Sequence, residues 1–200
     1  MNYFEICLGN YEWLIYNYYY IVEVGGCMEK INVLFDEETL NNRIKELGDK
    51  LYQEYKDEPV VFVCVLKGAV FFACDLAKSY KGDARIEFLR VKSYEGENTT
   101  GTVTMKLPLN EESVKGKHVL IVEDIVDTGK TMKFLQEYVA LMGAKSVKSC
   151  SLLDKLSRRV EDVKVDYIGF EIEDLFVIGY GLDYDEKYRN LPYIGVVVHE

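Results

Sequence analysis

The chain has 200 residues, of which 48% are hydrophobic and only three are proline, a composition that suits one domain with a sizeable core and argues against disorder. Its formal net charge of −10 counts against nonspecific binding to nucleic acid or anionic membranes, so individual lysines, arginines and a divalent metal would have to meet a polyanionic substrate. The five cysteines are scattered without a Cys-x-x-Cys pair, which indicates reduced thiols and a cytoplasmic protein.

The first 27 residues differ in composition from the rest. They are rich in tyrosine and contain no lysine or arginine, so they lack the basic start of a secretory signal, and their apolar run is too short and too polar to span a bilayer. Met28 is a plausible natural start, and Gly25-Gly26 can be encoded by a purine-rich pattern like a bacterial ribosome-binding site. We therefore expect residues 1–27 to be an extension from a misassigned start, and residues 28–200 to form the functional domain. Detecting a peptide from residues 1–27 in the native protein by mass spectrometry would contradict this.

Helical and strand patterns alternate after Met28. Asp36 can N-cap a helix whose apolar stripe repeats at spacings of three and four. The further predicted elements are a strand at 60–66, a helix at 69–78, strands at 85–91, 102–107 and 119–122, a helix at 131–142, and strands at 146–153, 167–172, 177–181 and 193–198. The order predicts one α/β domain: a mostly parallel central sheet flanked by helices, with a smaller strand-rich subdomain built partly from the carboxyl-terminal third.

Residues 119–131 carry the most specific pattern in the chain. Val119 to Val122 form an apolar run typical of a strand buried on both faces, and Glu123 and Asp124 follow it directly. Open α/β sheets place their ligands at the carboxyl ends of their strands, so these two carboxylates are candidates for ribose and metal contacts.

The next residues predict a phosphate site. Asp127-Thr128-Gly129-Lys130-Thr131 opens a helix, and such a turn points free backbone N–H groups, two hydroxyls and an ammonium toward one spot. The alternative is a buried strand followed by an N-capped helix with incidental acids. It does not explain three carboxylates beside Lys130 alone, because uncompensated acids repel one another unless a metal or a polyol holds them.

The segment Glu123–Thr131 resembles the 5-phosphoribosyl-1-pyrophosphate (PRPP) motif of the type I phosphoribosyltransferases, and its residues are similar to those of the hypoxanthine-guanine branch. The resemblance covers nearly all of residues 30–198. It implies the type I phosphoribosyltransferase fold with a small strand-rich hood, Mg²⁺ as cofactor, and assembly as a homodimer or homotetramer. The implied reaction is a step of purine salvage: PRPP and hypoxanthine or guanine are the substrates, the phosphoribosyl group is transferred to N9 of the base, and pyrophosphate is released.

The resemblance assigns roles within the motif. Glu123 and Asp124 hold the ribose hydroxyls, and together with Asp183 they are the candidate Mg²⁺ ligands, directly or through water. Asp127 is the candidate general base for the N7 proton of the purine. The 5′-phosphate is bound by Thr128, Gly129, Lys130 and Thr131.

Two further segments match the family around the leaving group. Lys67 and Gly68 follow the strand at 60–66, and the resemblance implies a cis Leu66–Lys67 peptide that directs backbone N–H groups toward pyrophosphate. An ordinary strand-to-helix turn using Gly68 is the alternative. Ser93 and Tyr94 match the lid dipeptide of the family, in a polar loop that by composition alone is a mobile hairpin loop.

The remaining matches concern the base and pyrophosphate. In the family, the lysine at the position of Lys155 donates to the 6-oxo oxygen of the purine, which implies a preference for 6-oxopurines over adenine. Phe176 resembles the aromatic residue that stacks on the purine, Val177 offers backbone groups to its edge, and Arg189 resembles a pyrophosphate ligand. By composition alone, Lys155 would be a solvated lysine and Phe176 a core residue.

Three other interpretations stay open. A xanthine phosphoribosyltransferase shares the PRPP motif, although Lys155 and the segment 176–183 favour the hypoxanthine-guanine branch. An RNA-binding regulator with the same fold would need a basic surface, and the acidic net charge with no basic cluster beyond Arg158-Arg159 counts against it. Asp127 and Arg189 disfavour a nonenzymatic nucleotide-binding module.

Overall fold

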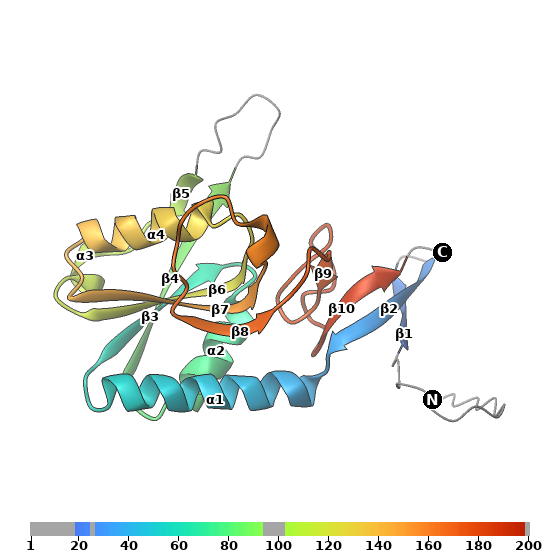
Figure 1. Cartoon of the computed structure of the whole chain (residues 1–200), viewed down its shortest axis with the longest axis horizontal. Coiled ribbons are helices and arrows are strands. Elements are labelled where there is room, and N and C mark those ends of the chain that lie inside the picture. Colours follow the sequence, from blue (N-terminus) through green and yellow to red (C-terminus); the bar gives the residue numbers. More distant parts are fainter. Residues whose placement is uncertain (1–18, 25–26, 94–102, 199–200) are drawn as a thin grey trace.

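The computed structural model describes residues 19–24, 27–93 and 103–198, and a six-stranded sheet forms its centre (Figure 1). The strand order is β5-β4-β3-β6-β7-β8; β5 runs antiparallel to β4 and every other neighbouring pair is parallel. The mostly parallel sheet predicted from the sequence is therefore confirmed. Its strands are β3 (Val60–Leu66), β4 (Ala84–Ser93), β5 (Val103–Leu107), β6 (His118–Val126), β7 (Ser146–Asp154) and β8 (Tyr167–Glu171).

Helices cover both faces of this sheet. The helices α1 (Glu37–Tyr55) and α2 (Val70–Ser79) lie on one face, and α4 (Lys130–Leu141) lies on the other (Figure 1). Strand β3 shows the consequence, because Phe62 and Cys64 pack with α1 and α2 while Val61 and Val63 pack with α4. A strand with two buried faces needs apolar residues throughout, which explains the continuous run at 60–66. Two short helical elements complete this part, α3 (Glu111–Val114) and the 3₁₀ turn η1 (Leu156–Arg158).

A second, antiparallel sheet stands beside the first, with strand order β1-β2-β10-β9. It contains β1 (Tyr19–Val24), β2 (Cys27–Phe35), β9 (Val177–Ile178) and β10 (Ile194–Val198), and it confirms the predicted strand-rich subdomain. Residues from both ends of the chain thus form one sheet (Figure 1). The expectation that residues 1–27 stand outside the functional domain falls mostly on residues beyond the described range and stays a prediction; the described part, β1, pairs with β2.

Element boundaries differ from those predicted, most of all in β6 and β9. Strand β6 continues to Val126, so Glu123 and Asp124 lie within the strand and not after it. Strand β9 ends at Ile178 because Gly179, Tyr180 and Gly181 all have positive φ values and turn the chain. Strands β1 and β2 were not among the predicted elements. Within the described residues, no helix has both the length and the apolar composition needed to cross a bilayer.

The first turn of α1 is closed by the predicted cap. Asp36 Oδ1 accepts a hydrogen bond of 2.8 Å from the backbone N–H of Thr39, and this contact lowers the pKa of the Asp36 carboxyl below its usual value. An N-cap carboxylate satisfies an N–H group that has no partner inside the helix. The cap therefore links the end of β2 to the start of α1.

Replacing Asp36 by alanine is expected to lower the free energy of unfolding by about 1 kcal/mol, measured by urea denaturation at neutral pH. Because the pKa of Asp36 is lowered on folding, its charge-dependent contribution is present above the ordinary pKa and is lost as the pH falls through the lowered one. Asp36→Asn is the matched control, since it keeps the acceptor without the charge. Equal stability of the wild type and Asp36→Ala would show that the cap contributes nothing.

Candidate active site

The candidate site lies at the carboxyl ends of β3, β6 and β7. These three strands are parallel neighbours, so the segments that follow them meet at one edge of the sheet, which is where open α/β sheets bind ligands. Lys67 and Gly68 follow β3, Glu123 and Asp124 lie near the carboxyl end of β6, and Lys155 follows β7. Three groups of residues predicted from separate segments are thus brought to the same edge.

Glu123 and Asp124 form a carboxyl pair whose charge is poorly compensated. They are adjacent in β6, and Asp124 Oδ1 accepts from the Ile125 N–H at 2.9 Å. Glu123 Oε2 is buried and has no hydrogen-bond partner. Burial and then the neighbouring Asp124 raise the pKa of Glu123 well above its usual value. Burial also raises the pKa of Asp124, although the hydrogen bonds from Glu123 and the backbone and the charge of Arg189 oppose this. A cation or the hydroxyls of a sugar would complete this pair.

The residues present fit a Mg²⁺ ion shared with a substrate. In the part of the chain that the structure describes, no three histidine, cysteine or acidic side chains converge as a metal site. The third predicted ligand, Asp183, directs Oδ1 to Arg189 Nη2 at 2.8 Å. Magnesium in proteins is commonly held by one or two carboxylates plus substrate phosphates, and the buried, unpartnered oxygen of Glu123 is suited to that arrangement.

The backbone at Lys67-Gly68 is held between β6 and the turn after β9. The Leu66–Lys67 peptide is cis, as the family resemblance implied. A Cβ added to Gly68 would lie 1.5 Å from Asp124 Oδ2, and one added to Gly181 would lie 1.9 Å from the carbonyl oxygen of Gly68. These two glycines allow backbone and carboxylate to approach closely, and they bring the segment 181–189 beside Lys67.

One carboxylate that the sequence did not indicate joins the side chains of Lys67 and Arg189. Arg189 and the backbone at Lys67 were the parts predicted to face pyrophosphate. Lys67 Nζ lies 2.7 Å from Glu186 Oε2, and Arg189 Nη2 lies 3.5 Å from Glu186 Oε1. Arg189 is further held by Asp183 and by the carbonyl of Gly181, which accepts from Nη1 at 2.7 Å. An acid three residues before Arg189 is the only signal in the sequence, and it does not reveal the contact with Lys67.

The predicted phosphate loop is a left-handed turn at the start of α4. Gly129 has φ +84 and is the N-cap residue, and α4 begins at Lys130. Its first N–H groups can meet an anion, which suits the predicted role of the loop. The carbonyl of Thr128 accepts from the N–H groups of Val160 and Glu161 at 3.0 and 3.2 Å. The loop is therefore braced by the segment that follows β7.

Arg159 packs under the same loop. A Cβ on Gly129 would lie 2.8 Å from the Arg159 side chain, and Arg159 pairs with the buried carboxylate of Asp154. In the sequence Arg158-Arg159 was only a short basic cluster, whereas each arginine has its own acidic partner within the fold. The supporting role of Arg159 was missed because nothing local connects it to Gly129.

Asp127 has a cationic partner that the sequence did not predict. Its Oδ1 lies 3.1 Å from Arg158 Nε, and Arg158 Nη1 lies 3.1 Å from Asp174 Oδ2. Asp174 Oδ1 in turn lies 3.3 Å from Lys155 Nζ. The expectation that Lys130 is the only basic residue near the acids is therefore wrong, because the fold brings Arg158 to Asp127.

Lys155 is a buried residue, 8% exposed, and not a solvated lysine. Its N–H donates to the carbonyl of Val126 at 3.0 Å, which ties the end of β7 to the end of β6. Phe176 is 59% exposed, so the alternative of a core residue is wrong, and its ring meets Tyr184 edge-on at 5.5 Å. Val177 is buried at the start of β9.

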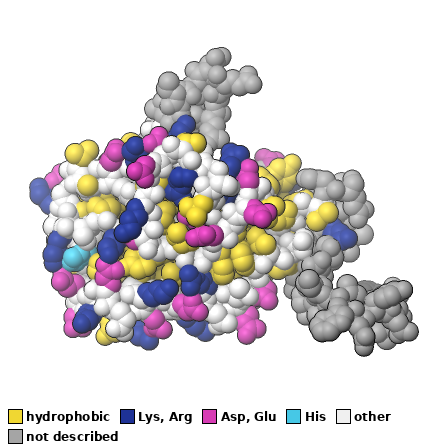
Figure 2. All heavy atoms as spheres, viewed as in Figure 1, with side chains coloured by type: hydrophobic (Ala, Val, Ile, Leu, Met, Phe, Trp, Pro, Cys, Tyr) yellow, Lys and Arg dark blue, Asp and Glu magenta, His cyan; other side chains and the backbone are white. Residues whose placement is uncertain are grey.

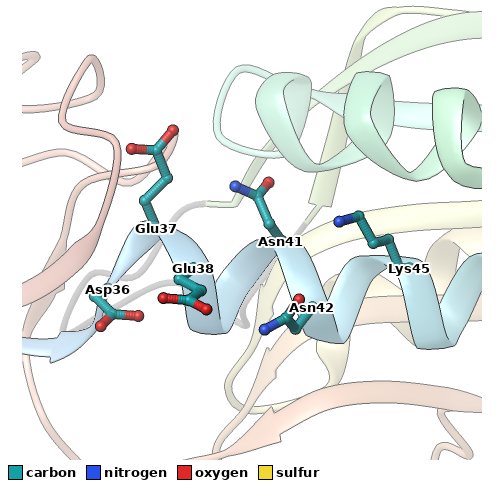
Figure 3. A pocket seen from close by; sticks show the side chains of 6 residues that line it. All are labelled: Asp36, Glu37, Glu38, Asn41, Asn42 and Lys45. Carbon is teal, nitrogen blue, oxygen red and sulfur yellow. The ribbon is translucent and has the colours of Figure 1, made fainter.

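Part of the predicted lid cannot be placed relative to this edge of the sheet. Ser93 ends β4, while Tyr94 and the rest of the predicted lid, through residue 101, lie outside the described residues. A separate surface pocket contains none of the predicted site residues (Figure 3). It is lined by polar side chains of the α1 cap and its first turns, namely Asp36, Glu37, Glu38, Asn41, Asn42 and Lys45.

Comparison of this chain with known proteins identifies the class of enzyme that its fold and site indicate. Residues 33–185 match the model of the phosphoribosyl transferase domain. The chain belongs to the phosphoribosyltransferase family, and its architecture is the type I fold.

The individual relatives of this chain belong to one branch of the phosphoribosyltransferase family. The chain is 46% identical over 166 residues to the hypoxanthine-guanine phosphoribosyltransferase of Bacillus subtilis (strain 168), covering 82% of this chain and 92% of the relative. It is 42% identical over 171 residues to the hypoxanthine phosphoribosyltransferase of Salmonella typhimurium (strain LT2), covering 84% and 96%. A crystal structure of a hypoxanthine phosphoribosyltransferase from Staphylococcus aureus superposes with a TM-score of 0.80 at 43% identity, over 84% of this chain and 91% of that one.

Proposed function

We propose that this protein is a purine salvage enzyme that transfers the 5-phosphoribosyl group from PRPP to hypoxanthine, guanine or both, giving IMP or GMP and pyrophosphate. The observation that carries the proposal is the convergence, at one sheet edge, of the Glu123–Asp124 pair, the loop at 127–131 and buried Lys155. The names of the relatives agree with this reaction. A cytoplasmic location suits the free thiols of Cys64, Cys74 and Cys150.

In the proposed mechanism, the bonding electrons move from the ribosyl carbon to the pyrophosphate leaving group. The ribosyl carbon passes through an oxocarbenium-like state, as in other glycosyl transfer, while negative charge develops on pyrophosphate. The backbone at Lys67-Gly68 and the guanidinium of Arg189 stabilise that charge. Glu123 and Asp124 orient the ribose hydroxyls, and they would hold Mg²⁺, which would neutralise part of the pyrophosphate charge. Asp183 positions Arg189 through their ion pair and can reach the metal through water.

The base side of the site removes a proton and selects the purine. Asp127 takes the N7 proton as N9 bonds to the ribosyl carbon. Lys155 donates to the 6-oxo oxygen, Val177 offers backbone groups to the base edge, and Phe176 stacks on the ring. The Lys155 ammonium donates hydrogen bonds, so it pairs with the 6-oxo group of hypoxanthine or guanine, which accepts them. It does not pair with the 6-amino group of adenine, which is itself a donor.

The decisive experiment is a steady-state assay with PRPP and Mg²⁺ against hypoxanthine, guanine, xanthine and adenine. Turnover of hypoxanthine or guanine with adenine inert is expected. Turnover of xanthine alone would move the assignment to the related branch. No turnover of any base, with PRPP still bound, would favour an RNA-binding regulator. Such a regulator needs a basic surface patch, whereas Lys and Arg lie interspersed with Asp and Glu on the face shown in Figure 2.

We also propose that the enzyme is a homodimer or a homotetramer. Phe71 of α2 and Ile86 and Phe88 of β4 are each more than 40% exposed, and the register of β4 against β3 places Ile86 and Phe88 on the sheet face that α2 covers. Exposed apolar side chains gathered on one surface favour association. Sedimentation velocity at micromolar concentration should give a dimer or larger species, and a monomer would contradict the proposal.

A further inference from the structure

Glu186 places its two carboxylate oxygens on two different cations. Oε2 lies 2.7 Å from Lys67 Nζ and Oε1 lies 3.5 Å from Arg189 Nη2, so one acid bridges residues from opposite parts of the chain. The proposed function places both residues at pyrophosphate, Arg189 through its guanidinium and Lys67 through its backbone. Carboxylates and phosphates are recognised by the same ammonium and guanidinium donors.

The turn that carries Glu186 holds it beside those cations. The N–H of Glu186 donates to Asp183 Oδ2 at 2.9 Å, and the backbones of Tyr184 and Lys187 are hydrogen-bonded to each other in both directions. Asp185 and Glu186 have φ values of 52° and 63°. Arg189 is anchored independently by Asp183 and Gly181, so it keeps its place when Glu186 leaves.

We propose that Glu186 is an internal stand-in for pyrophosphate: its carboxylate occupies the Lys67–Arg189 subsite in the free enzyme and is displaced when the pyrophosphate group of PRPP binds. This inference rests on the proposed function and deepens it. The contact gathers the two cations before substrate arrives and competes with pyrophosphate for them afterwards. A competing internal group reduces the apparent affinity to its intrinsic value multiplied by the fraction of molecules in which the subsite is free.

The exposure of the pair suits a displaceable contact. The Lys67 and Glu186 side chains are 45% and 63% exposed, so water and salt screen their attraction. Pyrophosphate carries more negative charge than one carboxylate and binds with Mg²⁺, so it outcompetes Glu186. A buried pair at this position would instead block the subsite.

The test compares Glu186→Gln with the wild type in binding inorganic pyrophosphate with magnesium chloride, by isothermal titration calorimetry at low and at high salt. The variant is expected to bind pyrophosphate about two- to tenfold more tightly, with the larger gain at low salt, and KM for PRPP should fall by a similar factor. Asp185→Asn is the matched control, because it removes the same charge from the neighbouring exposed position. It should leave the affinity within about twofold.

Each outcome decides between the proposals. The stand-in role is overturned if Glu186→Gln binds pyrophosphate with unchanged or weaker affinity, or if Asp185→Asn gains as much affinity. If the wild type uses PRPP in the same experiments, the proposed function still stands. A wild type that neither bound pyrophosphate nor used PRPP would overturn the proposed function and this inference together. Thermal unfolding of both variants checks that the fold is retained.

Discussion

Replacing Asp127 by asparagine is expected to lower kcat by about 10²–10⁴, the usual contribution of a general base, while PRPP binding is largely kept. Asparagine has nearly the same shape as aspartate but cannot take the N7 proton of the purine. Single-turnover kinetics with hypoxanthine, together with PRPP binding by calorimetry, separates the chemical step from substrate affinity.

The control for this prediction is Asp174→Asn. Arg158 contacts both acids, at 3.1 Å each, so either substitution removes one carboxylate partner from the same guanidinium. Only Asp127 is assigned to proton transfer, and Asp174→Asn should therefore keep kcat within about tenfold of the wild type. A kcat for Asp127→Asn that is itself within tenfold of wild type would show that Asp127 is not the base.

Replacing Gly181 by alanine is expected to reduce kcat/KM for PRPP by about 10²-fold or more and to destabilise the fold. Gly181 has φ +103, and an added Cβ would lie 1.9 Å from the carbonyl oxygen of Gly68, which is backbone and cannot rotate away. The left-handed geometry alone costs about 1–3 kcal/mol. Relief of the clash would separate Arg189 from Lys67, and a displacement of about 1 Å in an active site costs roughly 10²-fold.

Gly116→Ala separates these two effects. Gly116 also has a positive φ, +69°, but nothing lies within 4 Å of an added Cβ. It should show a loss of stability in urea denaturation with PRPP kinetics unchanged. If Gly181→Ala kept kcat/KM for PRPP within threefold of the wild type, the close approach of the turn to Gly68 would not matter for catalysis.

Features that depend on neighbours in the chain could be predicted from the sequence. The Asp36 cap, the continuous apolar strand at 60–66 and the acids at the end of β6 all follow from patterns a few residues long. The PRPP motif is equally local, since a strand, a turn and a helix N-terminus together make the phosphate loop. The parallel sheet follows from the alternation of helices and strands along the chain.

Other features had no local signal. Strands β1 and β2 were not predicted, and their place depends on pairing that the local sequence does not show: β1 pairs with β2, and β2 pairs with β10 from the other end of the chain. The short β9 was predicted too long, since its apolar pattern continues into a turn made by glycines with positive φ. Burial of Lys155 and exposure of Phe176 reverse what each residue type would do by default.

The sequence by itself determined which residue types are present for this chemistry: carboxylates, a phosphate loop, a lysine for the base and cations for pyrophosphate. Only the tertiary structure decided which charge meets which. Arg158 reaches Asp127 from 31 residues away, and Glu186 reaches Lys67 from 119 residues away. The physical reason is that hydrophobic periodicity and capping act over a few residues, whereas ion pairs form wherever the ends of parallel strands and the turns beside them converge.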